Sequence, residues 1–202
     1  MDRLLKGYHR FHETAWPQHR DTFDRLARQG QKPCTLVIAC SDSRVDPQMI
    51  FDAGPGELFV IRNVAALVPP YAPDAAYHGT SAALEFAVRA LQVEEVVVMG
   101  HGMCGGLQAL VEGVPAEVPD FVGDWIEIAA PARDKAMQAS DPEERRDICE
   151  HEAIKVSLKN LMTFPWVRRR VEAGTLKLYG CRFAVNTGVL ELLGEDGTFA
   201  PA

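Results

Sequence analysis

Two short apolar stretches that stop abruptly at reactive side chains constrain this chain more than any other feature. Residues 35–39 run into Cys40, and residues 95–99 run into a glycine that is followed by His101. Short β-branched runs of this kind are typical of buried parallel strands. Open α/β sheets hold their sites at the carboxyl edge, where such strands end. We therefore expect the side chains that follow the two runs to meet at one edge of a parallel sheet.

Three of these side chains have the chemistry of a metal site. Cys40, His101 and Cys104 supply two sulfurs and one nitrogen, which suit Zn2+ and leave one tetrahedral position open. A structural zinc site is the alternative, but such sites usually take four ligands from closely spaced Cys and His residues. Here the three ligands come from two distant strand ends, so we favour a catalytic site. The other cysteines are expected in core or surface positions: Cys34, Cys149 and Cys181.

A carboxylate and a guanidinium follow the first ligand. Asp42 and Arg44 alternate with Cys40, so an extended chain would point all three the same way. The pair could be an exposed ion pair worth about 0–1 kcal/mol. Beside a metal, Arg44 could instead hold Asp42 in a bidentate fork while Asp42 accepts a hydrogen bond from a zinc-bound water. Asp42 could also rotate onto the zinc and close the site, and the sequence leaves these alternatives open.

Length and charge narrow the class of protein. The 202 residues contain no linker-like stretch, so we expect one domain over 1–202, with 1–30 as a helical arm. A net charge of -7 with scattered Lys and Arg disfavours nucleic acid as a partner. No apolar run approaches the roughly 20 residues of a membrane span, so no membrane partner is expected. Five irregularly spaced cysteines and a charged start favour the reducing cytoplasm.

The order of the predicted elements indicates an α/β fold, a mainly parallel β-sheet with helical crossovers and an N-terminal helical arm. The arm should contain two helices separated near Trp16, and Asp46 should cap a short helix over 47–51. The other elements are expected as strands at 35–39, 58–62 and 95–99, helices at 82–91 (capped by Thr80 or Ser81), 106–112, 120–140 and 142–162 (capped by Asp141), and, after Gly174, a fourth parallel strand with an edge strand or hairpin.

Two motifs of the chain resemble those of the β-class carbonic anhydrases. They are Cys-Ser-Asp-Ser-Arg at residues 40–44 and His-Gly-Met-Cys-Gly-Gly at residues 101–106, and the likeness extends over most of the chain. The resemblance implies that Cys40, His101 and Cys104 hold zinc. It also implies that Asp42 and Arg44 form the catalytic dyad.

The same resemblance implies a substrate pocket and an assembly. The pocket residues are expected to be Gln31, Phe59, Val64 and Gly102. The family's sites lie near a subunit interface, so a homodimer or a dimer of dimers is expected.

The chain departs from the family pattern at three positions. Phe86 stands where many members carry a tyrosine, and Val37 and Phe183 stand where bicarbonate-inhibited members carry a tryptophan and a late tyrosine. We therefore expect this chain to lack the non-catalytic bicarbonate site.

The resemblance implies the reversible hydration of carbon dioxide to bicarbonate and a proton, by attack of zinc-bound hydroxide. Two alternatives remain. One is the hydrolysis of related molecules such as carbonyl sulfide or carbon disulfide on the same scaffold. The other is a structural or regulatory zinc protein whose site Asp42 closes.

Overall fold

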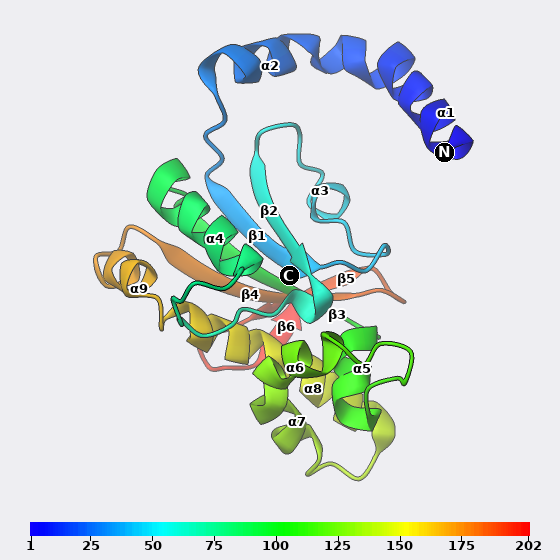
Figure 1. The fold of residues 1–202 in the computed structure, drawn as a ribbon, viewed down its shortest axis with the longest axis vertical. Coiled ribbons are helices and arrows are strands. Elements are labelled where there is room, and N and C mark those ends of the chain that lie inside the picture. The colour runs from blue at the N-terminus through cyan, green and yellow to red at the C-terminus, as the bar shows by residue number, and fades with distance from the viewer.

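A six-stranded sheet runs through the middle of the molecule in the computed structural model, which describes residues 1–202 (Figure 1). The strands are β1 (Thr35–Cys40), β2 (Leu58–Asn63), β3 (Glu95–His101), β4 (Lys177–Ala184), β5 (Val189–Leu193) and β6 (Phe199–Pro201). Their order across the sheet is β2-β1-β3-β4-β5-β6, with β1 to β4 parallel and β5 and β6 antiparallel. This arrangement confirms the predicted parallel α/β sheet, and β4 and β5 form the hairpin suggested at its edge.

Nine α-helices surround the sheet. They are α1 (Asp2–Arg10), α2 (Trp16–Gln29), α3 (Pro47–Ile50), α4 (Gly79–Glu85), α5 (Gly105–Glu112), α6 (Val122–Ile126), α7 (Ala130–Ala136), α8 (Pro142–Leu161) and α9 (Pro165–Glu172). Two of the predicted helix starts are confirmed by their caps. The Asp46 carboxylate accepts hydrogen bonds from the backbone N–H groups at the start of α3, and Asp141 does the same for α8. None of the helices is long and apolar enough to cross a lipid bilayer.

Two of the predicted helices differ from the structure, and one observed helix was not predicted. Helix α4 begins at Gly79, and its expected cap Thr80 accepts a hydrogen bond from Asn63 instead. The helix predicted over 120–140 is broken between α6 and α7, because Pro131 has no N–H to continue the first helix. Helix α9 was not predicted, because its arginine-rich sequence gives little apolar periodicity.

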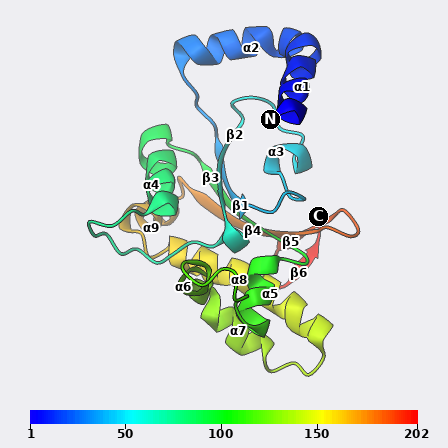
Figure 2. The same ribbon diagram turned by 45° about the vertical axis from the view of Figure 1, so that its right-hand side comes forward.

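Strand β1 is buried on both faces, which explains its unbroken apolar sequence. Leu36 and Ile38 enter one core cluster with residues of α4 and α9, whereas Val37 and Ala39 enter a second with residues of α5 and α7. Figure 2 shows helices α5 to α8 gathered on the side of the sheet away from the N-terminal arm. The carboxyl ends of β1 and β3 are therefore fixed by packing on both sides.

Helix α8 packs closely against β3 and β4 because both strands carry a glycine under it. A Cβ atom at Gly100 would lie 2.7 Å from Ile154 Cδ1, and one at Gly180 would lie 2.8 Å from Ile154 Cγ2. This close approach places the inward face of α8 directly beside the ends of the two strands.

The N-terminal arm projects from the rest of the chain, and its helix α2 contacts the turn before β2 through Leu26, which lies against Gly56 (Figures 1 and 2). Helices α1 and α2 contain no buried residue, and a π-helical turn (Phe11–Ala15) joins them where the sequence predicted a separation near Trp16. Leu4, Leu5 and Tyr8 remain exposed on α1. Within one chain, this apolar surface has no cover.

Candidate metal centre and active site

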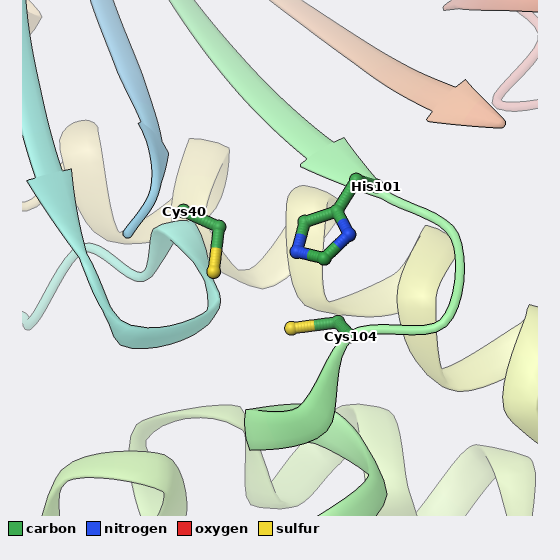
Figure 3. A group of neighbouring side chains, drawn as sticks. All are labelled: Cys40, His101 and Cys104. Atoms are coloured by element: carbon green, nitrogen blue, oxygen red, sulfur yellow. The ribbon is translucent and has the colours of Figure 1, made fainter. Parts of the chain in front are cut away.

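Three side chains converge at the carboxyl edge of the sheet. Cys40 ends β1, His101 ends β3, and Cys104 precedes the first turn of α5. Figure 3 shows the two sulfurs and the imidazole ring pointing toward one another. One ligand atom from each residue lies within 4.8 Å of the other two, and all three residues are buried. The two strand ends thus bring together the residues that the sequence predicted as ligands.

The imidazole of His101 is oriented for a metal. Its Nδ1 lies 2.9 Å from the carbonyl oxygen of Gly102, which can only accept a hydrogen bond, so Nδ1 carries the proton. The Nε2 atom is therefore left with a free lone pair, and it is buried without any partner. A buried nitrogen in this state is costly unless something binds it, and a metal ion would satisfy it.

The surroundings of Cys40 favour the deprotonated, thiolate form of its side chain. A hydrogen bond from the Cys104 thiol lowers the pKa of Cys40, against the opposing effect of burial. The backbone N–H of Ala65 also donates to Cys40 Sγ at 3.3 Å. Ala65 reaches this position with a φ of 65°, in the left-handed region that a non-glycine residue rarely adopts. The donor set and its surroundings fit Zn2+, which binds thiolates and neutral imidazole.

Asp42 and Arg44 form a bidentate pair beside the three ligands. Arg44 Nε donates to Asp42 Oδ1 at 2.9 Å and Nη2 donates to Oδ2 at 2.7 Å, while the backbone N–H of Arg44 also donates to Oδ1. These hydrogen bonds hold the pKa of the Asp42 carboxyl well below its usual range. Asp42 contributes no atom to the close ligand group, so in this structure its carboxylate is directed to Arg44.

Arg62, which was not predicted as a site residue, holds the loop that carries Asp42 in place. Its Nε donates to the carbonyl oxygen of Cys40 at 2.9 Å, and its Nη2 donates to that of Asp42 at 2.6 Å. Nη1 reaches Asp46 Oδ2 at 3.1 Å, which ties the loop to the cap of α3. An arginine near the end of an otherwise apolar strand was the available signal.

Glu150 supports the other ligand loop and was also missed. It lies on α8 with only 1% exposure, and its Oε1 accepts from the backbone N–H groups of Met103 at 2.6 Å and Cys104 at 3.4 Å. Arg182 neutralises it, with Nε 2.8 Å from Glu150 Oε2. The carbonyl oxygen of Met103 in turn accepts from Arg44 Nη2 at 3.0 Å. One peptide segment therefore links the buried Glu150–Arg182 pair to both Cys104 and the Asp42–Arg44 pair.

The four predicted pocket residues occupy different parts of the fold. Val64 follows β2 beside Ala65, and Gly102 follows His101, so both adjoin the ligand group. Phe59 is aligned with Leu36 near the start of β1, and its ring faces that of Phe86. Gln31 precedes β1 and is exposed, which places it at the opposite edge of the sheet from Cys40 within one chain.

The fold and the site together define an α/β protein with a buried Cys2His group at the edge of a parallel sheet, which could hold a metal ion. The carbonic anhydrase family model matches residues 35–190. Carbonic anhydrases of Synechococcus elongatus and Synechocystis sp. are each 38% identical to this chain, over 93% and 98% of it and 70% and 72% of their own lengths.

Solved structures give the same result. The β-carbonic anhydrase CcaA has a TM-score of 0.93 at 34% identity, over 100% of this chain and 99% of that one. A tetrameric β-carbonic anhydrase of Sordaria macrospora has a TM-score of 0.83 at 28% identity, over 96% of each chain. The chain belongs to the β-class carbonic anhydrases, which are lyases.

Proposed function

We propose that this chain catalyses the reversible hydration of carbon dioxide with Zn2+ held by Cys40, His101 and Cys104. The observation that carries the proposal is the buried, unpartnered Nε2 of His101, which faces two thiols. When bound, Zn2+ would lower the pKa of a water and so supply hydroxide at near-neutral pH. Three protein ligands leave one tetrahedral position for that water.

The chain's own residues would orient the nucleophile. Both oxygens of Asp42 are fixed by Arg44, which is itself anchored to the carbonyl oxygen of Met103. A carboxylate fixed in this way can accept a hydrogen bond from the attacking water. The water is thereby oriented with a lone pair of its oxygen toward carbon dioxide. Val64 directly precedes Ala65, whose N–H donates to Cys40 Sγ, and its apolar side chain offers no competing hydrogen bond.

Stopped-flow measurement of carbon dioxide hydration on protein of known zinc content tests the proposal. We expect the rate to rise between about pH 6 and pH 9, because the nucleophile is deprotonated water. Asp42 should not contribute to this rise. Its pKa is lowered, so the ion pair with Arg44 is present above the ordinary carboxyl value of about 3.9 and is lost only as the pH falls further.

Two outcomes of this assay would contradict the proposal. A zinc-loaded protein that is inactive at every pH would favour a site closed by Asp42. A protein that is inactive on carbon dioxide but hydrolyses carbonyl sulfide would favour the related hydrolase activity.

We further propose that bicarbonate acts only as a product. The positions at which bicarbonate-inhibited members carry a tryptophan and a tyrosine are here Val37, buried in β1, and Phe183 in β4. Neither side chain has a polar group to bind an anion. Cooperative inhibition by bicarbonate in the same assay would count against this proposal.

Glu150 provides a test of how the ligand loop is held. We expect Glu150→Gln to lower zinc affinity or zinc-loaded activity by about 10-fold to 100-fold, as loss of an outer partner of a metal ligand does. Glutamine can still accept from Met103 N–H, but it removes the fully buried carboxylate that pairs with Arg182 and leaves only the more exposed Asp147 and Glu191 as its counter-charges. Zinc titration and kcat at full zinc occupancy measure the two effects.

Glu152→Gln is the matched control for this variant. Glu152 lies on the same helix but pairs with Lys135 and Lys155. If Glu150→Gln and Glu152→Gln had the same zinc affinity and the same kcat, Glu150 would have no specific role in holding the ligand loop.

We propose that the protein works as a homodimer or a dimer of dimers. The uncovered apolar side chains of α1 need a partner, and a second copy would supply one. Gln31 lies at the far edge of its own sheet, so it would line a pocket only across such an interface. A monomeric mass in light scattering would contradict this assembly.

Because both ligand thiols must stay reduced, we place the protein in the cytoplasm.

A further inference from the structure

A second cleft lies at the amino edge of the sheet, opposite the metal centre. It has a volume of about 730 Å³, within the range of small-molecule sites. Residues before β1, at the starts of β3 and β4, and on α9 line it, together with the π-helical turn that follows α4 (Phe86–Leu91). Figure 1 shows α9 beside the start of β4. No residue assigned to the metal centre or its substrate pocket lines this cleft.

Positive charge is concentrated in this cleft although the chain carries a net charge of -7. Its lining contains five cationic side chains and two carboxylates. The cations are Lys32, Arg89, Arg169, Arg170 and Lys177, and the carboxylates are Glu94 and Glu95. The cleft is therefore a local reversal of the protein's overall charge, which would concentrate anions there.

Most of these cations lack a counter-charge. Arg89 pairs with Glu85, but Lys32, Arg169 and Lys177 form no ion pair within the chain. The Glu95 carboxylate accepts instead from the Thr35 hydroxyl at 3.2 Å. The free cations are thus available to a ligand from outside.

Arg170 is a fixed cation in the wall of the cleft. Its Nη1 donates to the carbonyl oxygen of Val88 at 2.9 Å, and its Nη2 donates to that of Thr175 at 2.7 Å. Both partners are neutral, so the guanidinium keeps its full charge. A guanidinium held in one position loses little entropy when it binds phosphate or carboxylate groups.

We propose that this cleft binds a small multivalent anion that carries phosphate or carboxylate groups. Arg169 and Arg170 on α9 would bind one anionic group. Lys32 and Lys177 flank the start of β3, because β3 lies between β1 and β4, and they would bind another. An anion with two charged groups can engage both pairs of cations at once, and this attraction offsets the repulsion from Glu94 and Glu95.

Calorimetric titration of the zinc-loaded full chain with inorganic pyrophosphate and with citrate tests this proposal. We expect saturable binding that weakens with added salt, and the tighter of the two probes identifies phosphate or carboxylate as the preferred group. Arg169→Gln combined with Lys177→Gln should weaken binding about tenfold or more, because each removes a charge-assisted hydrogen bond. Carbon dioxide hydration by this double variant should be unchanged. Zinc content is measured before and after, because both probes chelate metals.

Arg168→Gln is the control, since Arg168 is exposed on the same helix but does not line the cleft. Because Arg168→Gln removes one charge and the double variant removes two, equal weakening per charge removed would show that only net charge matters and would overturn the proposal. The proposal would also be overturned if neither probe bound saturably, or if the double variant bound the probes as tightly as the unaltered chain does. Binding of an acidic peptide alone would also overturn it, in favour of a macromolecular partner.

Discussion

Replacement of Asp42 by asparagine is expected to leave zinc binding intact and to reduce turnover by about 10²-fold to 10³-fold, the range for loss of a positioned polar group at a reacting centre. Arg44 now donates to both carboxylate oxygens. An asparagine replaces one of these acceptors with an NH2 group, which would face an N–H donor and has no negative charge. The group that orients the nucleophile would then be both misdirected and neutral. The three ligand atoms belong to other residues, so zinc should remain.

The measurement is kcat for carbon dioxide hydration together with zinc content in the same sample. Asp52→Asn is a suitable control, because Asp52 is exposed, makes no side-chain hydrogen bond, and has a φ of 48° that asparagine tolerates. A zinc-loaded Asp42→Asn protein with the turnover of that control would exclude Asp42 from catalysis. Loss of zinc from Asp42→Asn alone would indicate instead that the carboxylate is a ligand.

Short-range patterns in the sequence predict the strands of this fold and the edge of the sheet at which their ends meet. The run before Cys40 is apolar on both faces because β1 is covered on both faces, and it is this burial that makes the strand recognisable. Because neighbouring parallel strands run in the same direction, their carboxyl ends meet at one edge of the sheet. The convergence of Cys40, His101 and Cys104 could therefore be expected before any coordinates were known.

The supporting residues could not be found in the same way. Glu150 is separated by 46 residues from Cys104, and Arg62 by 22 from Cys40. Neither spacing matches a helix or strand period, so only tertiary packing brings each charge to its partner. For Glu150 the available signal was its position between Cys149 and Ala153 on one face of the helix, since a charge on the inward face of a helix needs a counter-charge.

Replacement of Cys104 by serine is expected to have the largest effect on this protein. A serine hydroxyl stays protonated near neutral pH and binds Zn2+ poorly, whereas the thiolate is a preferred ligand. The remaining pair, Cys40 and His101, cannot close a stable site, so zinc affinity should fall by orders of magnitude and activity should fall with it. Cys34→Ser serves as the control, because Cys34 is a free, exposed cysteine outside the ligand group.

Two readouts separate loss of the metal from loss of the fold. Zinc titration, or the thiolate-to-metal absorption of the Co2+-substituted protein, reports directly on the ligand set. The unfolding midpoint without metal should change little, since serine is close to cysteine in volume and the Glu150 contact to the backbone of residue 104 remains possible. A Cys104→Ser protein that binds zinc as tightly as Cys34→Ser would show that the metal lies elsewhere. If its zinc-free form were instead unfolded, Cys104 would be primarily a core residue.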